Sequence, residues 1–154
     1  VSLEFKGFDE STWRQIGKPI TAESGSFTSS LYLAKSGKVR ITSEGSWDRG
    51  AGMRSEVSIT INPRLNITAP TSAKVGAAIK VLVMAAPVTA GAQVTLQRFD
   101  GKVWVNLTTL PLLATGTEFG PTELTRGVFS YRIVVLSSAD SAQSTSASFV
   151  VLVR

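Results

Sequence analysis

The feature of this sequence that most constrains its fold is an internal repeat. Segments from its beginning return in the same order in its second half, with only small insertions or deletions between them. The matched segments are residues 1–3 with 94–96, Trp13 with Trp104, residues 25–27 with 116–119, 37–41 with 127–133, and 55–61 with 146–153. Similarity over a whole unit predicts that one supersecondary structure is used twice.

Within each copy, apolar and polar residues alternate with a period of two. Clear examples are residues 1–5, 56–61 and 129–133, and Gly, Pro or Asp stands at the breaks between such runs. This alternation is typical of half-buried β-strands, and many short strands at even spacing favour two packed sheets. We therefore predict an all-β chain of antiparallel sheets.

The two copies differ in what precedes the matched segments. Residues 65–68 and 78–84 read as two strands at the start of the second copy, and the first copy has no counterpart to them. We predict an incomplete unit at residues 1–63, lacking its two opening strands, and a complete unit at residues 64–154. In the first unit, only a strand near residues 27–33 is expected to face the apolar side of the other strands.

The pattern also predicts one side-chain pair in each copy. Leu3 and its alternate neighbours should point inward, which leaves Glu4 outside, and the same reasoning places Arg40 outside. In a sandwich of about seven strands in two sheets, the third and sixth strands, which carry these two residues, are neighbours. We expect Glu4 and Arg40 to form a cross-strand pair, with Gln97 beside Arg132 in the second copy.

Motifs of the second copy resemble those of bacterial immunoglobulin-like, or fibronectin type III-like, repeats. The residues that carry the resemblance are Val75-Gly76, Pro87-Val88, Gly91, Val94-Thr95-Leu96-Gln97-Arg98, Trp104, Gly116, Gly127 and Tyr131-Arg132. The resemblance implies tandem antiparallel β-sandwiches of secreted, surface-attached or phage virion proteins. It implies a non-catalytic spacer, stalk or adhesive module, located outside the cell, on its surface or in a virion. The fold itself hosts many functions.

The sequence lacks the residues that most catalytic and metal sites use. It contains no histidine and no cysteine, which removes the commonest general base, the commonest metal ligand and any disulfide. Asp9, Asp100 and Asp140 stand in predicted turns, where a carboxylate bonds nearby backbone amides. We expect no enzyme, no cofactor and no metal site, and a calcium site assembled from separate loops stays open as an alternative.

One loop of the first copy differs in chemistry from its counterpart. Residues 45–54 are rich in glycine and contain a tryptophan, whereas residues 138–143 contain no aromatic side chain. Trp, Arg and Met are enriched at interfaces, and loops at the end of a sandwich are where such folds bind. The alternative is that Trp47 packs on its own hairpin or on the neighbouring unit. The candidate partner-binding residues are Trp47, Arg49, Met53 and Arg54.

Charge and hydropathy bound the class of partner. The net charge is +5, but the basic residues are scattered and do not cluster beside stacking aromatics, as they do in nucleic-acid sites. No apolar run is long enough to span a membrane. We expect no nucleic acid and no membrane span. The expected partners are other protein subunits or a cell-surface polymer, together with upstream chain or a donated strand that covers the first unit.

A second function stays open from the sequence alone. A carbohydrate-binding accessory module of a secreted hydrolase would use exposed aromatic rings on one surface. Trp47 is the best candidate for such a platform, and a second ring, from Tyr32 or Phe8 for instance, would have to lie beside it.

Overall fold

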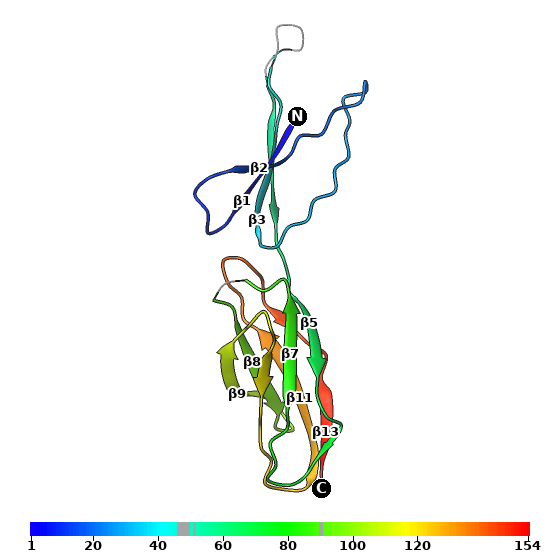
Figure 1. The fold of residues 1–154 in the computed structure, drawn as a ribbon, viewed down its shortest axis with the longest axis vertical. Helices are drawn as coiled ribbons and strands as arrows, with labels where there is room; N and C mark the ends of the chain where they lie inside the picture. Colours follow the sequence, from blue (N-terminus) through cyan, green and yellow to red (C-terminus); the bar gives the residue numbers. More distant parts are fainter. Residues whose placement is uncertain (46–49, 51, 90) are drawn as a thin grey trace. The chain divides into compact units, whose positions relative to one another are not determined.

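The computed structural model describes residues 1–45, 50, 52–89 and 91–154. In these residues the chain is all-β and contains no helix (Figure 1). It divides into two compact units: unit 1 is Val1–Ile61 with Ala139–Ser141, and unit 2 is Asn62–Ser138 with Ala142–Arg154. No helix long and apolar enough to cross a membrane occurs in the part of the chain that the structure describes.

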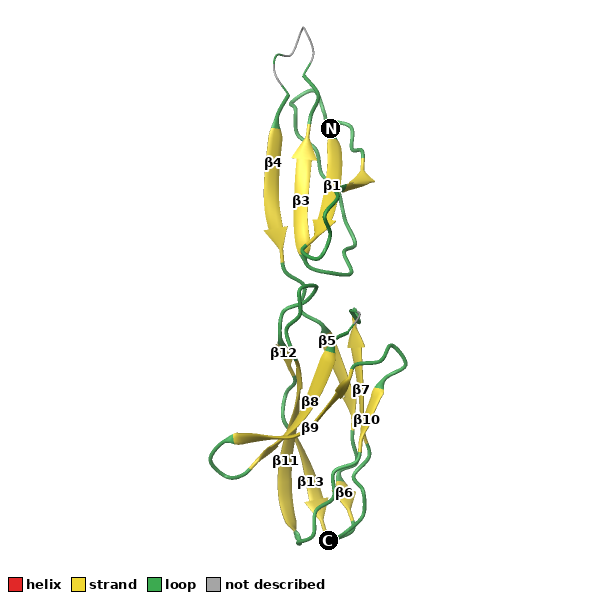
Figure 2. Cartoon of the chain, turned by 90° about the vertical axis from the view of Figure 1, so that its left-hand side faces the viewer, coloured by secondary structure: helices red, strands yellow, loops and turns green. Residues whose placement is uncertain are grey.

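Unit 1 is built on one four-stranded antiparallel sheet with the order β2-β1-β3-β4. Three of these strands are seen side by side in Figure 2. The strands are β1 (Ser2–Gly7), β2 (Arg14–Gly17), β3 (Gly37–Thr42) and β4 (Arg54–Ile59). Leu3 pairs with Ile41 and Phe5 with Val39, so these four apolar side chains share one face of the sheet.

The stretch between β2 and β3 is a long loop in Figure 1, and residues 18–36 contain no strand. The prediction of a strand near residues 27–33 is therefore wrong. The physical reason is seen in unit 2, where the corresponding strand β10 (Thr117–Phe119) forms its ladder with β7 (Val81–Ala86). Unit 1 has no counterpart of β7 among its described residues, so this segment finds no backbone partner.

Unit 2 contains two sheets. The smaller has the order β10-β7-β5, and the larger has the order β6-β13-β11-β8-β9 with β12 paired to β11. The remaining strands are β5 (Arg64–Thr68), β6 (Ser72–Ala73), β8 (Gln93–Phe99), β9 (Trp104–Pro111), β11 (Gly127–Val135), β12 (Ser144–Thr145) and β13 (Phe149–Val153). The strands predicted at residues 65–68 and 78–84 correspond to β5 and, shifted by a few residues, β7.

The core of unit 2 lies between its two sheets. Val81 and Val83 from β7 share one buried cluster with Val94 from β8, Ile133 from β11 and Val151 from β13. All five of these side chains are fully buried. Each sheet thus covers the apolar face of the other, which is the main stabilising contribution in a two-layered β fold.

The central strands of the two units pair in the same register. Equivalent pairs are Leu3–Ile41 and Leu96–Ile133, Glu4–Arg40 and Gln97–Arg132, and Val39–Val57 and Tyr131–Phe149. By position, β1, β3 and β4 of unit 1 therefore correspond to β8, β11 and β13 of unit 2.

The predicted cross-strand pair is confirmed in both units. Arg40 Nε lies 2.5 Å from Glu4 Oε2, and Arg132 Nε lies 2.6 Å from Gln97 Oε1. The pair occupies the outer face because the flanking residues Leu3 and Val39 take the inner one. Arg40 also lowers the pKa of the Glu4 carboxyl, first through the hydrogen bond and then through its charge.

Candidate functional site

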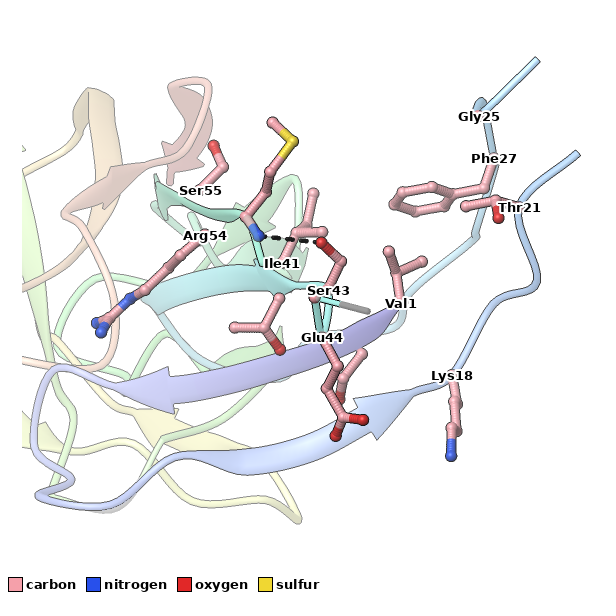
Figure 3. A pocket seen from close by; sticks show the side chains of 14 residues that line it. Val1, Lys18, Thr21, Gly25, Phe27, Ile41, Ser43, Glu44, Arg54 and Ser55 are labelled. Carbon is pink, nitrogen blue, oxygen red and sulfur yellow. Dashed lines mark hydrogen bonds between the residues drawn. The ribbon is translucent and has the colours of Figure 1, made fainter. Parts of the chain in front are cut away.

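A pocket of about 570 Å³ lies at one end of the unit 1 sheet (Figure 3). The beginning of β1, the end of β3, the beginning of β4 and the loop that holds Thr21, Gly25 and Phe27 form its wall. In Figure 3 the ring of Phe27 extends from this loop toward the side chains of Val1 and Ile41. The interior of the pocket is therefore mainly apolar.

Polar groups stand at the edge of this pocket. The Met53 N–H donates a hydrogen bond to Ser43 Oγ at 3.1 Å, which joins the two ends of the β3–β4 connection. Arg54 directs its guanidinium away from Phe27 (Figure 3), and its Nε donates to Glu56 Oε1 at 3.0 Å. That contact lowers the pKa of Glu56.

The structure brings two of the four predicted partner-binding residues to this pocket. Met53 and Arg54 both line it, and Met53 is 77% exposed. Trp47 and Arg49 lie outside the described residues. Sequence reasoning placed Phe27 in an expected strand and did not select it as a site residue. The sequence feature that indicated an open apolar face near Phe27 was the absence of the two opening strands from the first copy.

The pocket occupies the place that core fills in unit 2. Val1 and Ile41 are half-buried, whereas their counterparts Val94 and Ile133 are fully buried beneath the smaller sheet. The sequence is equally apolar at these positions in both units. The difference in burial therefore comes from the second sheet, which covers this face in unit 2 and has no counterpart among the described residues of unit 1.

Strand β4 is open to solvent on the same side of the sheet. Val57 is 56% exposed, although its neighbour across the strand pair, Val39, is buried. Ile59 is only half-buried, while its counterpart in unit 2, Val151, is fully buried. Apolar side chains in a row on a regular strand normally mark a surface that another element covers.

The other end of the sheet is covered by the unit itself. Phe5 is fully buried, and its ring lies directly on Gly37, where a Cβ atom would come within 2.7 Å of Phe5 Cζ. The Arg14 guanidinium lies 5.1 Å from the centre of the same ring. The opening in unit 1 therefore lies at the end formed by Val1 and Ile41 and continues along the edge strand β4, where Val57 is exposed.

The two repeated tryptophans lie on the outer face of their sheets. The Arg40 guanidinium lies 4.2 Å from the centre of the Trp13 ring, and Arg132 lies 4.5 Å from that of Trp104. Each unit thus places a tryptophan and an arginine in a cation–π contact at the same position of its outer face. Tyr32 and Phe8 are exposed, but the ring beside which they were expected, Trp47, lies outside the described residues.

A charged cluster gathers around Lys35 in unit 1. Lys35 Nζ lies 2.8 Å from Asp9 Oδ1 and 2.9 Å from Glu10 Oε1, and these bonds lower the pKa of both carboxyls. Burial, followed by the charge of Asp9, raises the pKa of Asp140. The Asp140 carbonyl accepts a hydrogen bond from the Ser36 N–H at 2.6 Å. Among the described residues, no group of three or more acidic side chains is arranged to hold a metal ion.

The opposite pKa directions in this cluster give a pH prediction. Because the pKa of Asp140 is raised in the folded state, the folded chain binds its proton more tightly, and Asp140 lowers stability as the pH rises through its titration range. Asp140→Asn is expected to raise the urea midpoint at neutral pH and to change it little at pH ~3. Urea titrations at the two pH values measure the effect.

A matched control is available in unit 2. The backbone N–H groups of Val103 and Lys102 lower the pKa of Asp100, so its contribution to stability is present at neutral pH and is lost in acid. Asp100→Asn is expected to lower the urea midpoint at neutral pH. A lower midpoint for Asp140→Asn at neutral pH would contradict the prediction.

No family model matches the sequence, and no curated protein matches it. The interpretation of the pocket therefore depends on its geometry, which offers an apolar interior lined by Val1, Phe27 and Ile41 with polar side chains at the rim.

Proposed function

We propose that this protein is a non-catalytic structural module of an extracellular or virion assembly, in which tandem immunoglobulin-like units act as a spacer, stalk or adhesive element. The observation that carries the proposal is the common register of β1-β3-β4 and β8-β11-β13. In unit 2, a β10-β7-β5 sheet covers a β13-β11-β8-β9 sheet, and this strand order supports the proposal of an immunoglobulin-type sandwich. Repetition of such a unit suits a mechanical role.

The connector between the matched segments also supports a spacer. Pro63 is buried, and its carbonyl accepts a hydrogen bond from Ser144 Oγ at 2.7 Å. Strand β5 begins at the next residue, Arg64. Proline restricts its own backbone and that of the residue before it, so this short connector has few conformations available.

The spacer role makes a prediction about distance. Because the chain has no cysteine, Ser58→Cys and Thr125→Cys place one spin label on an exposed position of each unit without a competing thiol. Pulsed electron–electron double resonance is expected to give one narrow distribution of distances between the two labels. Adding Pro63→Gly and Ser144→Ala to the labelled chain should broaden it.

The same measurement tests the proposal directly. A broad distribution with the native connector would mean that the two units reorient freely, which argues against a spacer. Circular dichroism of each labelled chain controls for unfolding, since loss of the strand signal would also broaden the distances.

A further inference from the structure

We infer that the pocket of unit 1 receives two β-strands of the same polypeptide that come directly before β1, as β5 and β7 come before β8 in unit 2. This inference rests on the proposed equivalence of the two units. It names the occupant of the open sheet end: an antiparallel strand pair with an apolar side chain at every second position.

The first step concerns the side chains that fill the equivalent space in unit 2. Val94 and Ile133 correspond to Val1 and Ile41, which line the pocket. Both share their buried cluster with Val83 of β7, and further side chains of β5 and β7 pack against that cluster. In unit 2, the sheet that contains β5 and β7 therefore supplies the apolar side chains that would fill the equivalent of the pocket.

The second step concerns chain connection. β7 ends at Ala86 and leads through a short loop to β8, whose residue Val94 follows Gln93. Ala92 in this loop is buried and its carbonyl accepts a hydrogen bond from the Leu112 N–H at 2.8 Å, so the entering chain is part of the core. Val1 lines the pocket, so a chain joined to Val1 enters unit 1 at the pocket itself.

The third step concerns the loop that was expected to be a strand. β10 of unit 2 forms its ladder with β7. Its sequence counterpart in unit 1 includes Phe27, whose ring extends into the pocket without any strand pairing around it. A counterpart of β7 would supply the backbone partner for this segment and an apolar surface for Phe27, which is the arrangement that the added strands have to produce.

The test adds the strands in their natural connection. Residues 64–93 of this chain are joined directly before Val1 of the full chain, because Val94, which follows Gln93, is the counterpart of Val1. Amide hydrogen exchange in β3 and β4 is expected to slow about tenfold or more, since a second layer packed on their inner face suppresses local opening of the sheet. Exchange should also slow around Phe27. A fusion with residues 77–93, which supplies β7 without β5, should give an intermediate slowing.

The control changes only the added segment. Val81→Asp and Val83→Asp in the added copy leave length and connection the same but place charges where both native residues are fully buried. This control is expected to exchange in β3 and β4 as the unfused chain does. The inference would be overturned if the control slowed exchange in β3 and β4 as much as the unaltered fusion does. It would also be overturned if exchange stayed fast in the fusions with residues 64–93 and 77–93 while unit 2 stayed protected.

Two further outcomes separate this inference from the proposed function. If the unfused chain is a dimer in which β4 is already protected, a second copy donates the strands, and the inference is wrong. If the spin-label distances are narrow but the fusion does not slow exchange, the proposed spacer function is supported and only the proposed strand pair in the pocket is rejected.

Discussion

Ile133→Ala is expected to destabilise unit 2 by about 2–5 kcal/mol, whereas Ile41→Ala in unit 1 should cost less than half as much. The two isoleucines occupy the same register position, each opposite a leucine of the neighbouring strand. Ile133 is fully buried, so truncation leaves a cavity; Ile41 is half-buried beside an open pocket that water already reaches. Native-state hydrogen exchange, read separately for amides of each unit, measures both free energies.

Leucines at the matched positions serve as the control for this comparison. Leu3 and Leu96 are both buried, so Leu3→Ala and Leu96→Ala are expected to cost similar amounts. In the chain extended by residues 64–93, the cost of Ile41→Ala should rise toward that of Ile133→Ala. Equal costs in the unextended chain would mean that the end of the unit 1 sheet is closed by some other contact.

Glu123→Ala is expected to cost about 3 kcal/mol, because it removes the acceptor of a buried network in unit 2. Glu123 is buried, and its Oε1 and Oε2 accept hydrogen bonds from Arg98 Nη1 at 2.9 and 2.7 Å. The hydroxyl of the fully buried Tyr131 donates to Glu123 Oε1 at 2.7 Å. Arg98 keeps part of its hydration, so the loss stays below that of a fully buried ion pair. Urea unfolding measures the change.

Companion variants show whether these three residues act as a unit. Glu123→Gln keeps an acceptor for Tyr131 and removes the charge, so its cost should be smaller than that of Glu123→Ala. Tyr131→Phe alone should cost about 1 kcal/mol. Once Glu123 is alanine, Tyr131→Phe should cost almost nothing, because its hydroxyl has already lost its acceptor. Additive losses would contradict the network.

The same network shows what a single sequence leaves out. The pKa of Tyr131 is raised, first by burial and then by its hydrogen bond to Glu123, yet nothing in the sequence marks either residue as one of a pair. Glu123 lies in a loop between β10 and β11, and the Gly76 N–H donates to its carbonyl at 2.8 Å. Contacts of this kind join segments that have no common local pattern.

The sequence by itself determined several of the strands and which of their side chains face outward. Alternation of apolar and polar residues depends only on neighbours two positions apart, and this was enough to place Glu4 and Arg40 on the outer face. That their strands are neighbours was expected from the strand order of an immunoglobulin-like sandwich. The repeat then carried the same reasoning to Gln97 and Arg132. Alternation and repetition are local or periodic signals, so they indicate which side chains face outward, whereas the pairing of distant strands was taken from the expected fold.

Only the tertiary structure decided where each segment finds its partners. The segment around Phe27 has the composition of a strand but forms none, because a β-strand exists only beside another strand that takes its backbone hydrogen bonds. The grouping of Asp9, Lys35 and Asp140 likewise depends on three distant segments meeting in space. The pocket at Val1 arises for the same reason. The alternation in the sequence predicts an apolar strand face, but the packing of the layers decides which element covers that face.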